Sequence, residues 1–240
     1  MPIPPQTSSP DYNALGGGRP LAWGRFLVVI LAGMAFAGVA LPADPHVAGV
    51  AANLQPGAKW ALGGDLKREL EFAQQFGAVT SVVIAWVAIL LLDAGKRRYL
   101  AAFLAATVAN VVVCNGMKML LGRPRPKLMA PFELTPPWQT HPVTDAGVVV
   151  ARHGWETSQL WSFPSSHTAA AVVLAVFLMR MYPKLQPLVV SLAVVVAIAR
   201  VVLFAHYPSD VIGGATVGWA VATLATTPWA LTRLCPRAWR

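Results

Sequence analysis

The chain has 240 residues, of which 56% are hydrophobic and 12% are charged. Soluble globular domains carry about 25% charged residues, so this composition excludes an ordinary cytosolic enzyme, a disordered chain and a disulfide scaffold. Lys and Arg exceed Asp and Glu by 19 to 10, a net charge of +9 that we interpret through membrane orientation rather than nucleic-acid binding.

Residues 1–20 are rich in proline, glycine and small polar residues, which predicts a flexible N-terminal tail. The segment has no basic stretch leading directly into an apolar one, so it does not fit a simple signal peptide. We expect residues 21–240 to form a single membrane-embedded domain.

Six apolar segments follow, each close to the roughly 20 residues that a membrane-spanning helix needs. They run from about Leu21 to Leu41, Phe76 to Leu92, Leu100 to Leu121, Ser166 to Met181, Pro187 to Phe204, and Val211 to Leu231. Two of them are short, but six in one small chain predict an all-α bundle of six transmembrane helices.

The charges of the connections predict an orientation. The raw Lys and Arg counts of the two sides are nearly equal, so the tight loop Lys96-Arg97-Arg98 between the second and third spans decides it. The positive-inside rule places this loop, and both termini, in the cytoplasm. We expect an integral protein of a bacterial inner membrane whose third and fifth spans end on the periplasmic or extracellular side.

Two long connections lie on that outer side, over residues 42–75 and 122–164. The first contains the mixed-charge stretch from Asp65 to Phe72, which fits a helix lying on the membrane surface or a plain solvated helix equally well. The second is rich in proline, tryptophan and histidine, and loops of this length are usually functional or disordered.

Ionisable residues collect where spans end on the outer side. Lys118 and Arg200 lie in the last turns of the third and fifth spans, where charges are costly unless they serve a function or reach the interface. Arg123 and Arg125 follow the third span, and the proline after each arginine disfavours helical geometry. The sequence therefore predicts an extended basic arm beyond this helix.

The starts of the fourth and sixth spans add groups that suit an anion. Ser165 can cap the fourth helix, whose free amides and dipole favour negative charge beside His167. His206 and Asp210 lie close in sequence across a turn, with Asp210 in the first turn of the sixth helix. A carboxylate that accepts from one imidazole nitrogen leaves the other nitrogen free as nucleophile or base.

These helix ends predict one cluster on one face of the membrane. It comprises Lys118, Arg125, Ser165, His167, Arg200, His206 and Asp210. Three cations and a helix N-terminus suit a phosphoryl group, and two histidines suit a nucleophile and a general acid. No acidic cluster or metal-spaced histidine pair accompanies them, so we expect no metal ion and no cofactor.

At these residues the chain resembles the type-2 phosphatidic acid phosphatase superfamily. That family shows the patterns K-x6-RP, PSGH and SR-x5-H-x3-D. The corresponding residues are Lys118…Arg125-Pro126, then Pro164-Ser165-Ser166-His167, then Ala199-Arg200…His206…Asp210. Ser166 replaces the usual glycine and Ala199 the usual serine, while every gap is intact.

The resemblance implies a phosphatidic acid phosphatase/haloperoxidase-like core and a role for each matching residue. It implies that His206 attacks phosphorus to form a phosphohistidine, that Asp210 orients His206, and that His167 protonates the leaving oxygen. The implied phosphate-binding residues are Lys118, Arg125, Arg200, Ser165 and the amide of Ser166. Arg123 lies outside the motif and is interpreted as an accessory.

The sequence therefore predicts an integral-membrane lipid phosphate phosphatase, with a lipid phosphate as substrate and membrane lipids as neighbours. A lipid phosphotransferase of the same fold is an alternative, and a non-catalytic transporter or scaffold is disfavoured because both histidines and Arg200 are present. The related vanadium haloperoxidases are typically soluble. The sequence leaves open the oligomeric state and the lipid: isoprenyl diphosphate, phosphatidylglycerol phosphate, phosphatidate or the lipid A 1-phosphate group.

Overall fold

The computed structural model describes residues 21–54, 60–61, 63–145 and 147–234. The predicted flexible tail, residues 1–20, lies outside the described residues. Residues 235–240, at the C-terminus that we expect in the cytoplasm, also lie outside them.

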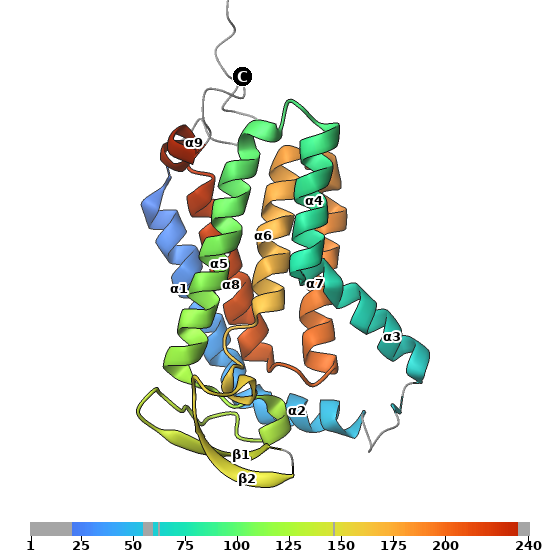
Figure 1. Cartoon of the computed structure of the whole chain (residues 1–240), viewed down its shortest axis with the longest axis vertical. Helices are drawn as coiled ribbons and strands as arrows, with labels where there is room; N and C mark the ends of the chain where they lie inside the picture. Colours follow the sequence, from blue (N-terminus) through green and yellow to red (C-terminus); the bar gives the residue numbers. More distant parts are fainter. Residues whose placement is uncertain (1–20, 55–59, 62, 146, 235–240) are drawn as a thin grey trace, which may run out of the picture.

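All six predicted apolar segments form helices, which stand side by side in a bundle (Figure 1). They are α1 (Trp23–Ala40), α4 (Val79–Leu92), α5 (Leu100–Leu121), α6 (Ser166–Met181), α7 (Gln186–Val202) and α8 (Pro208–Ala225). The bounds of α5 and α6 are as predicted. Helix α8 begins at Pro208, three residues before the sixth apolar segment, because the fixed φ of proline suits a first helical position.

Shorter elements connect the bundle helices. Three are α-helices: α2 (Asp44–Asn53), α3 (Gly64–Ala73) and α9 (Pro228–Leu234). The 3₁₀ turns are η2 (Leu41–Ala43), η3 (Gln74–Gly77), η4 (Arg97–Tyr99), η5 (Pro126–Leu128), η6 (Ser158–Leu160) and η7 (Pro183–Leu185). Helix α3 confirms that the mixed-charge stretch is helical, and its position relative to a membrane stays a prediction.

Fewer helices qualify as candidate membrane spans than the six expected, so the number of spans stays a prediction. In the described part of the chain, three helices are long and apolar enough to cross a bilayer, and five are if each bent helix pair counts as one span. The bent pairs are α3 with α4, at 55°, and α8 with α9, at 66°. Helix α6 is apolar but only 16 residues long, too short to qualify by length.

The expectation of an all-α fold is wrong within residues 122–164, and the protein is mostly helical. Strands β1 (Thr140–Asp145) and β2 (Val148–His153) pair antiparallel, with Val143 opposite Val150. Valine and threonine favour a pleated strand, and the turn at Gly147 joins the two segments. A six-residue strand is stable only against its partner, so the composition of this loop did not reveal it.

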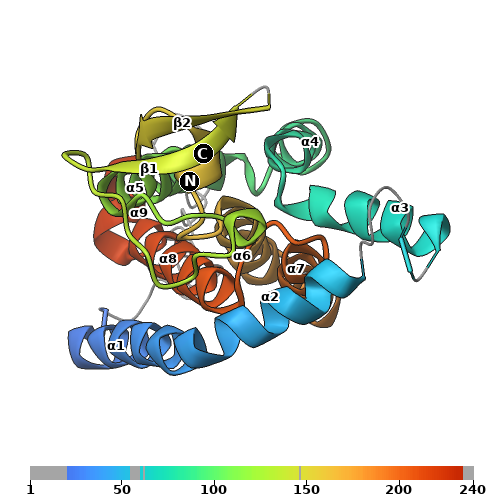
Figure 2. The ribbon, with the colours of Figure 1, turned by 90° about the horizontal axis from the view of Figure 1, so that it is seen from below.

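Helix α6 lies at the centre of the bundle, between α5, α7 and α8 (Figures 1 and 2). Phe103 of α5 stacks on Phe177 of α6, with ring centroids 4.9 Å apart and both side chains fully buried. On the other side α8 approaches α6 closely at Gly214, where an added Cβ would lie 2.5 Å from the carbonyl oxygen of Ser165. This contact brings the first turns of α6 and α8 together.

One end of the bundle, called here the site end, is where α5 and α7 finish and where α6 and α8 begin. Seen from this end, α2 and the β1–β2 hairpin lie on opposite sides of the bundle (Figure 2). At the opposite end α4 connects to α5, and α6 connects to α7. The predicted site residues therefore come from helix termini that share one end of the molecule.

Candidate active site

The first turn of α8 fixes the position of Asp210. Its Oδ2 accepts a hydrogen bond from the backbone amide of Tyr207 at 2.9 Å, as an acidic residue in a capping box does. The same oxygen lies 3.5 Å from Nδ1 of His206, and both side chains are buried. The sequence-predicted pair of His206 and Asp210 is thus brought together, at an ion-pair distance longer than a normal hydrogen bond.

His206 lies in the short connection between α7 and α8, where burial controls its protonation. Burial lowers the pKa of His206 to about 4; Asp210 raises this pKa, and Arg200 and Arg125 lower it further. The imidazole is therefore neutral at pH 7. With Nδ1 turned towards Asp210, the other ring nitrogen, Nε2, is left for attack on an electrophile.

Three cations and the second histidine form a cluster beside His206. Lys118 interacts electrostatically with Arg125 and Arg200, and His167 interacts with all three cations. Like charges held this close repel one another, so the cluster favours binding of an anion.

The hydrogen bonds of these cations go to neutral oxygens. Nζ of Lys118 donates to Oγ of Ser166 at 2.5 Å. Nε of Arg125 donates to the Ser158 carbonyl oxygen at 2.8 Å. Nη1 of Arg200 donates to the Gln74 side-chain oxygen at 2.5 Å. Because none of these hydrogen-bond partners is charged, the hydrogen bonds do not neutralise the three cations, and the cluster can accommodate a phosphoryl group.

Ser165 is the N-cap of α6, as predicted. Its Oγ accepts from the amide of Thr168 at 3.5 Å and shares a 3.0 Å hydrogen bond with the Thr168 hydroxyl. Its own amide donates to the Asp210 carbonyl oxygen at 3.0 Å, which ties the starts of α6 and α8 together. Contact of Ser165 with a phosphate stays a prediction.

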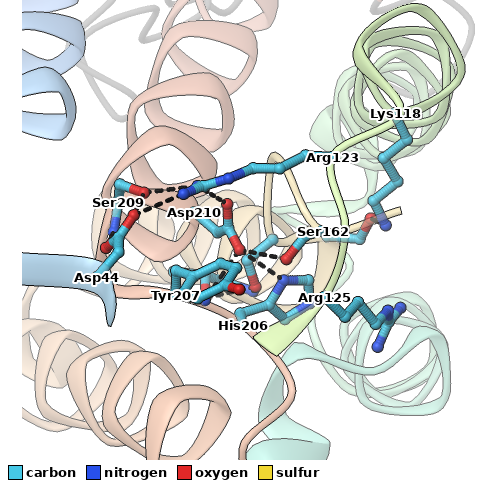
Figure 3. A network of polar contacts seen from close by, with 12 residues as sticks. Asp44, Lys118, Arg123, Arg125, Ser162, His206, Tyr207, Ser209 and Asp210 are labelled. Carbon is cyan, nitrogen blue, oxygen red and sulfur yellow. Dashed lines mark hydrogen bonds and ion pairs between the residues drawn. The ribbon is translucent and has the colours of Figure 1, made fainter. Parts of the chain in front are cut away.

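Arg123, interpreted from the sequence as an accessory, contacts Asp210 of the buried His206–Asp210 pair directly (Figure 3). Helix α5 ends at Gly122, whose left-handed φ of 56° turns the chain so that the extended arm begins at Arg123. The guanidinium is buried, and its Nη1 donates to Asp210 Oδ1 at 2.5 Å and to Ser209 Oγ at 2.7 Å. Its Nη2 donates to Asp44 Oδ2 at 2.7 Å.

The comparisons with known proteins agree with this geometry. The model of the PAP2 superfamily matches residues 99–233, more than half of the chain. The chain belongs to the PAP2 superfamily. The resemblance inferred from the sequence motifs is therefore confirmed.

Two solved structures are similar to this PAP2 protein, and no curated protein matches it. The first is the transmembrane PAP2-type phosphatidylglycerolphosphate phosphatase from Bacillus subtilis, which superposes with a TM-score of 0.51 and is 19% identical in sequence. The match covers 85% of this chain and 91% of that chain. The second is LpxE from Aquifex aeolicus, with a TM-score of 0.47 and 17% sequence identity. That match covers 70% of this chain and 87% of the LpxE chain. The first likeness shows the fold of a membrane PAP2 phosphatase. Together with the apolar helices, it identifies an integral membrane protein.

Three polar residues of this PAP2 site escaped the sequence analysis. Asp44 starts α2 and is fully buried against Arg123, although it is only one of several acidic residues on the outer side. Ser162 donates to Asp210 Oδ2 at 2.5 Å, and Gln74 accepts from Arg200. The position of Asp44 just after an apolar span was the only hint in the sequence that it has a special role. That position does not reveal Arg123 as its partner.

Among the described residues, no group of three or more His, Cys, Asp or Glu side chains could hold a metal ion.

Proposed function

We propose that this protein is an integral-membrane lipid phosphate phosphatase that hydrolyses a lipid mono- or diphosphate through a phosphohistidine. The observation that carries the proposal is the convergence of the buried His206–Asp210 pair with Lys118, Arg125 and Arg200 at one end of an apolar bundle. A neutral imidazole and three cations that hydrogen-bond neutral oxygens are what in-line displacement at phosphorus requires.

The first step of the proposed reaction transfers the phosphoryl group to the enzyme. Nε2 of His206 attacks phosphorus while the bond from phosphorus to the lipid oxygen breaks. The positive charge that develops on the imidazole is stabilised by Asp210 at Nδ1. The negative charge of a phosphate bound beside His167 favours the protonated form of this imidazole. His167 then gives its proton to the departing oxygen, so the lipid alcohol leaves neutral when the substrate is a monophosphate.

The second step returns the enzyme to its starting state. A water molecule attacks phosphorus, neutral His167 takes one of its protons, and the bond from phosphorus to His206 breaks. Lys118, Arg125 and Arg200 hold the equatorial oxygens in both steps, together with the amide of Ser166 at the start of α6. Inorganic phosphate then leaves, with His206 neutral and His167 protonated.

An apolar groove supports a lipid as the substrate. It has a volume of about 270 Å³, begins at Thr168, the residue after His167, and runs between α6, α7 and α8. Its lining includes Val172, Ala193, Ala197 and Trp219. A hydrocarbon chain in this groove would leave its phosphate at the site end, next to the cation cluster.

Phosphate release from the purified protein in detergent tests the function. The substrates are isoprenyl diphosphate, phosphatidylglycerol phosphate, phosphatidate and lipid A 1-phosphate, each with and without EDTA. We expect release from at least one lipid, unchanged by EDTA and inhibited by vanadate, which mimics the trigonal-bipyramidal transition state. Activity that EDTA abolishes and only a divalent ion restores would contradict the proposed mechanism.

The same assay separates the alternatives. Loss of the lipid phosphate with no inorganic phosphate formed, but with phosphorylation of an added lipid alcohol, would identify a phosphotransferase. No turnover of any substrate would favour a non-catalytic transporter or scaffold.

We further propose that the site end faces away from the cytoplasm of a bacterial cell. The opposite end carries the basic turn that contains Arg97 and Arg98, which the positive-inside rule places in the cytoplasm. Val149 in β2 is 69% exposed, so Val149→Cys in a Cys114→Ala/Cys235→Ala background reports the orientation. An impermeant thiol reagent should label this variant on intact cells, and labelling only after lysis would reverse the orientation.

A further inference from the structure

A row of buried charges connects the start of α2 to the catalytic pair. Asp44 is 0% exposed, Arg123 is 3% exposed and Asp210 is 0% exposed. The three come from distant parts of the chain and meet at the site end, with Arg123 between the two carboxylates (Figure 3). Burying three charges costs desolvation that their mutual attraction does not reliably recover. A contribution to stability is therefore a weak reason for this arrangement.

The guanidinium of Arg123 is held from several directions. Nη1 binds Asp210 and Nη2 binds Asp44, while Nε and Nη2 also donate to the Pro131 carbonyl oxygen at 3.0 and 2.7 Å. The ring of Tyr207 lies against the guanidinium, with 4.6 Å from Cζ to the ring centroid. A planar group fixed in this way allows little rotation of either carboxylate that it binds.

Arg123 also determines how the two oxygens of Asp210 are used. Oδ1 accepts from Arg123, so Oδ2 is the oxygen that accepts from Ser162 and Tyr207 and faces Nδ1 of His206. Without Arg123 the carboxylate could turn about its terminal bond and would lose the oxygen position that orients the imidazole.

Asp44 adds a second negative charge on the far side of Arg123. It also fixes the first turn of α8, since its Oδ1 accepts from the Ser209 amide at 3.1 Å and its Oδ2 accepts from the Ser209 hydroxyl. One cation shared between two carboxylates leaves a net charge of −1 in the row. Without Asp44, the charge of Arg123 would compensate Asp210 alone and weaken its attraction for a positive imidazole.

We propose that Asp44 and Arg123 are positioning residues for the nucleophile: they hold Asp210 in one orientation and keep it effectively anionic when His206 gains positive charge. This inference rests on the proposed phosphohistidine chemistry. It assigns a reaction role to α2, a segment outside the residues matched by the family model.

The decisive variant is Asp44→Asn, which keeps the size of the side chain and removes its charge. We expect kcat for a lipid phosphate and the rate of phosphoenzyme formation to fall roughly 10–100-fold, as when a group that orients an active-site ligand is removed. KM should stay within about twofold, because Asp44 does not contact the cation cluster. The matched control is Asp93→Asn. It removes a carboxylate that accepts a hydrogen bond from the Tyr182 hydroxyl at the opposite end of the bundle, and we expect it to leave kcat unchanged.

A second pair of variants covers the case in which Asp44→Asn does not fold. Arg123→Lys keeps the positive charge and can donate to one carboxylate. Arg123→Gln loses both the charge and the two guanidinium nitrogens that bind Asp210 and Asp44. Arg123→Lys should retain clearly more phosphoenzyme formation than Arg123→Gln. Equal rates in these two variants, or wild-type kcat in folded Asp44→Asn, would overturn the inference.

Vanadate affinity separates this inference from the proposed function, because vanadate binding needs an oriented His206 but no turnover. We expect the vanadate-induced increase in melting temperature to require at least about tenfold more vanadate in Asp44→Asn than in the wild type. If the wild type binds vanadate in this Asp44-dependent way but hydrolyses no lipid phosphate, the proposed function fails and the inference stands. If the wild type is active and both proteins bind vanadate equally, the inference fails alone.

Discussion

The two ends of the helix bundle use cations in different ways. At the opposite end, Arg97 donates to the Leu90 carbonyl oxygen at 2.6 Å, and Arg233 lies 4.4 Å from the centroid of Trp229. Each of these two arginines therefore interacts with its own neutral group, a carbonyl oxygen or an aromatic ring. At the site end, Lys118, Arg125 and Arg200 interact electrostatically with one another and with His167.

This difference shows why counting charges could not locate the site. The two sides carry similar numbers of Lys and Arg residues in the sequence, yet only one end brings them together around histidines. Separate cations on carbonyl groups and aromatic rings fit a role in anchoring a helix end at an interface. Convergent cations fit an anion site, and variants at the two ends can test this distinction.

The largest effect is expected at the two histidines of the site end. His206→Ala should abolish turnover and phosphoenzyme with every substrate, because no nucleophile remains. His167→Ala should lose about 10²–10⁴-fold on a lipid monophosphate, the usual contribution of general acid catalysis. The loss should be smaller with p-nitrophenyl phosphate, whose leaving group needs little protonation. Steady-state rates and trapping of the phosphoenzyme measure both.

Both histidine variants need a folding control. Each should keep near-native melting in detergent and elute as a single species, because both side chains lie at the end of the bundle rather than in its apolar core. Phosphoenzyme in His206→Ala, or equal losses in both variants on both substrates, would contradict the assigned roles.

An intermediate effect is expected from one arginine at each end. Arg200→Gln should lower kcat/KM by about 10²–10³-fold and weaken inhibition by vanadate, since it removes one charged donor from the phosphoryl oxygens. Arg97→Gln should stay within about twofold of the wild type, because Arg97 contacts a carbonyl oxygen far from the cluster. Similar losses in the two variants would erase the distinction between the ends.

The smallest effect is expected in the groove that begins at the site end. Ala197→Phe would fill part of the space between α6, α7 and α8, and we expect KM for a lipid phosphate to rise about tenfold. Activity on p-nitrophenyl phosphate, which has no hydrocarbon tail, should be unchanged. The matched control is Ala101→Phe on the exposed face of α5. An equal loss on both substrates in Ala197→Phe would indicate a distorted site rather than a blocked groove.

Local features of the fold could be predicted from the sequence. The bounds of α5 and α6, the Ser165 cap and the proline start of α8 each depend on residues within a few positions of one another. The hairpin was missed because strand stability depends on pairing. Fewer helices than six qualify as candidate spans because α6 is short and two helix pairs are bent.

The sequence by itself determined that the chain is mostly helical and apolar, and its motif spacing identified the PAP2 superfamily and the candidate site residues. Only the tertiary structure decided that Arg123 joins Asp44 to Asp210 and that Gln74 binds Arg200. Those contacts join residues 79, 87 and 126 positions apart. Helix periodicity and capping act over a few residues. Contacts over such long separations arise from helix packing, and no spacing in the sequence encodes them.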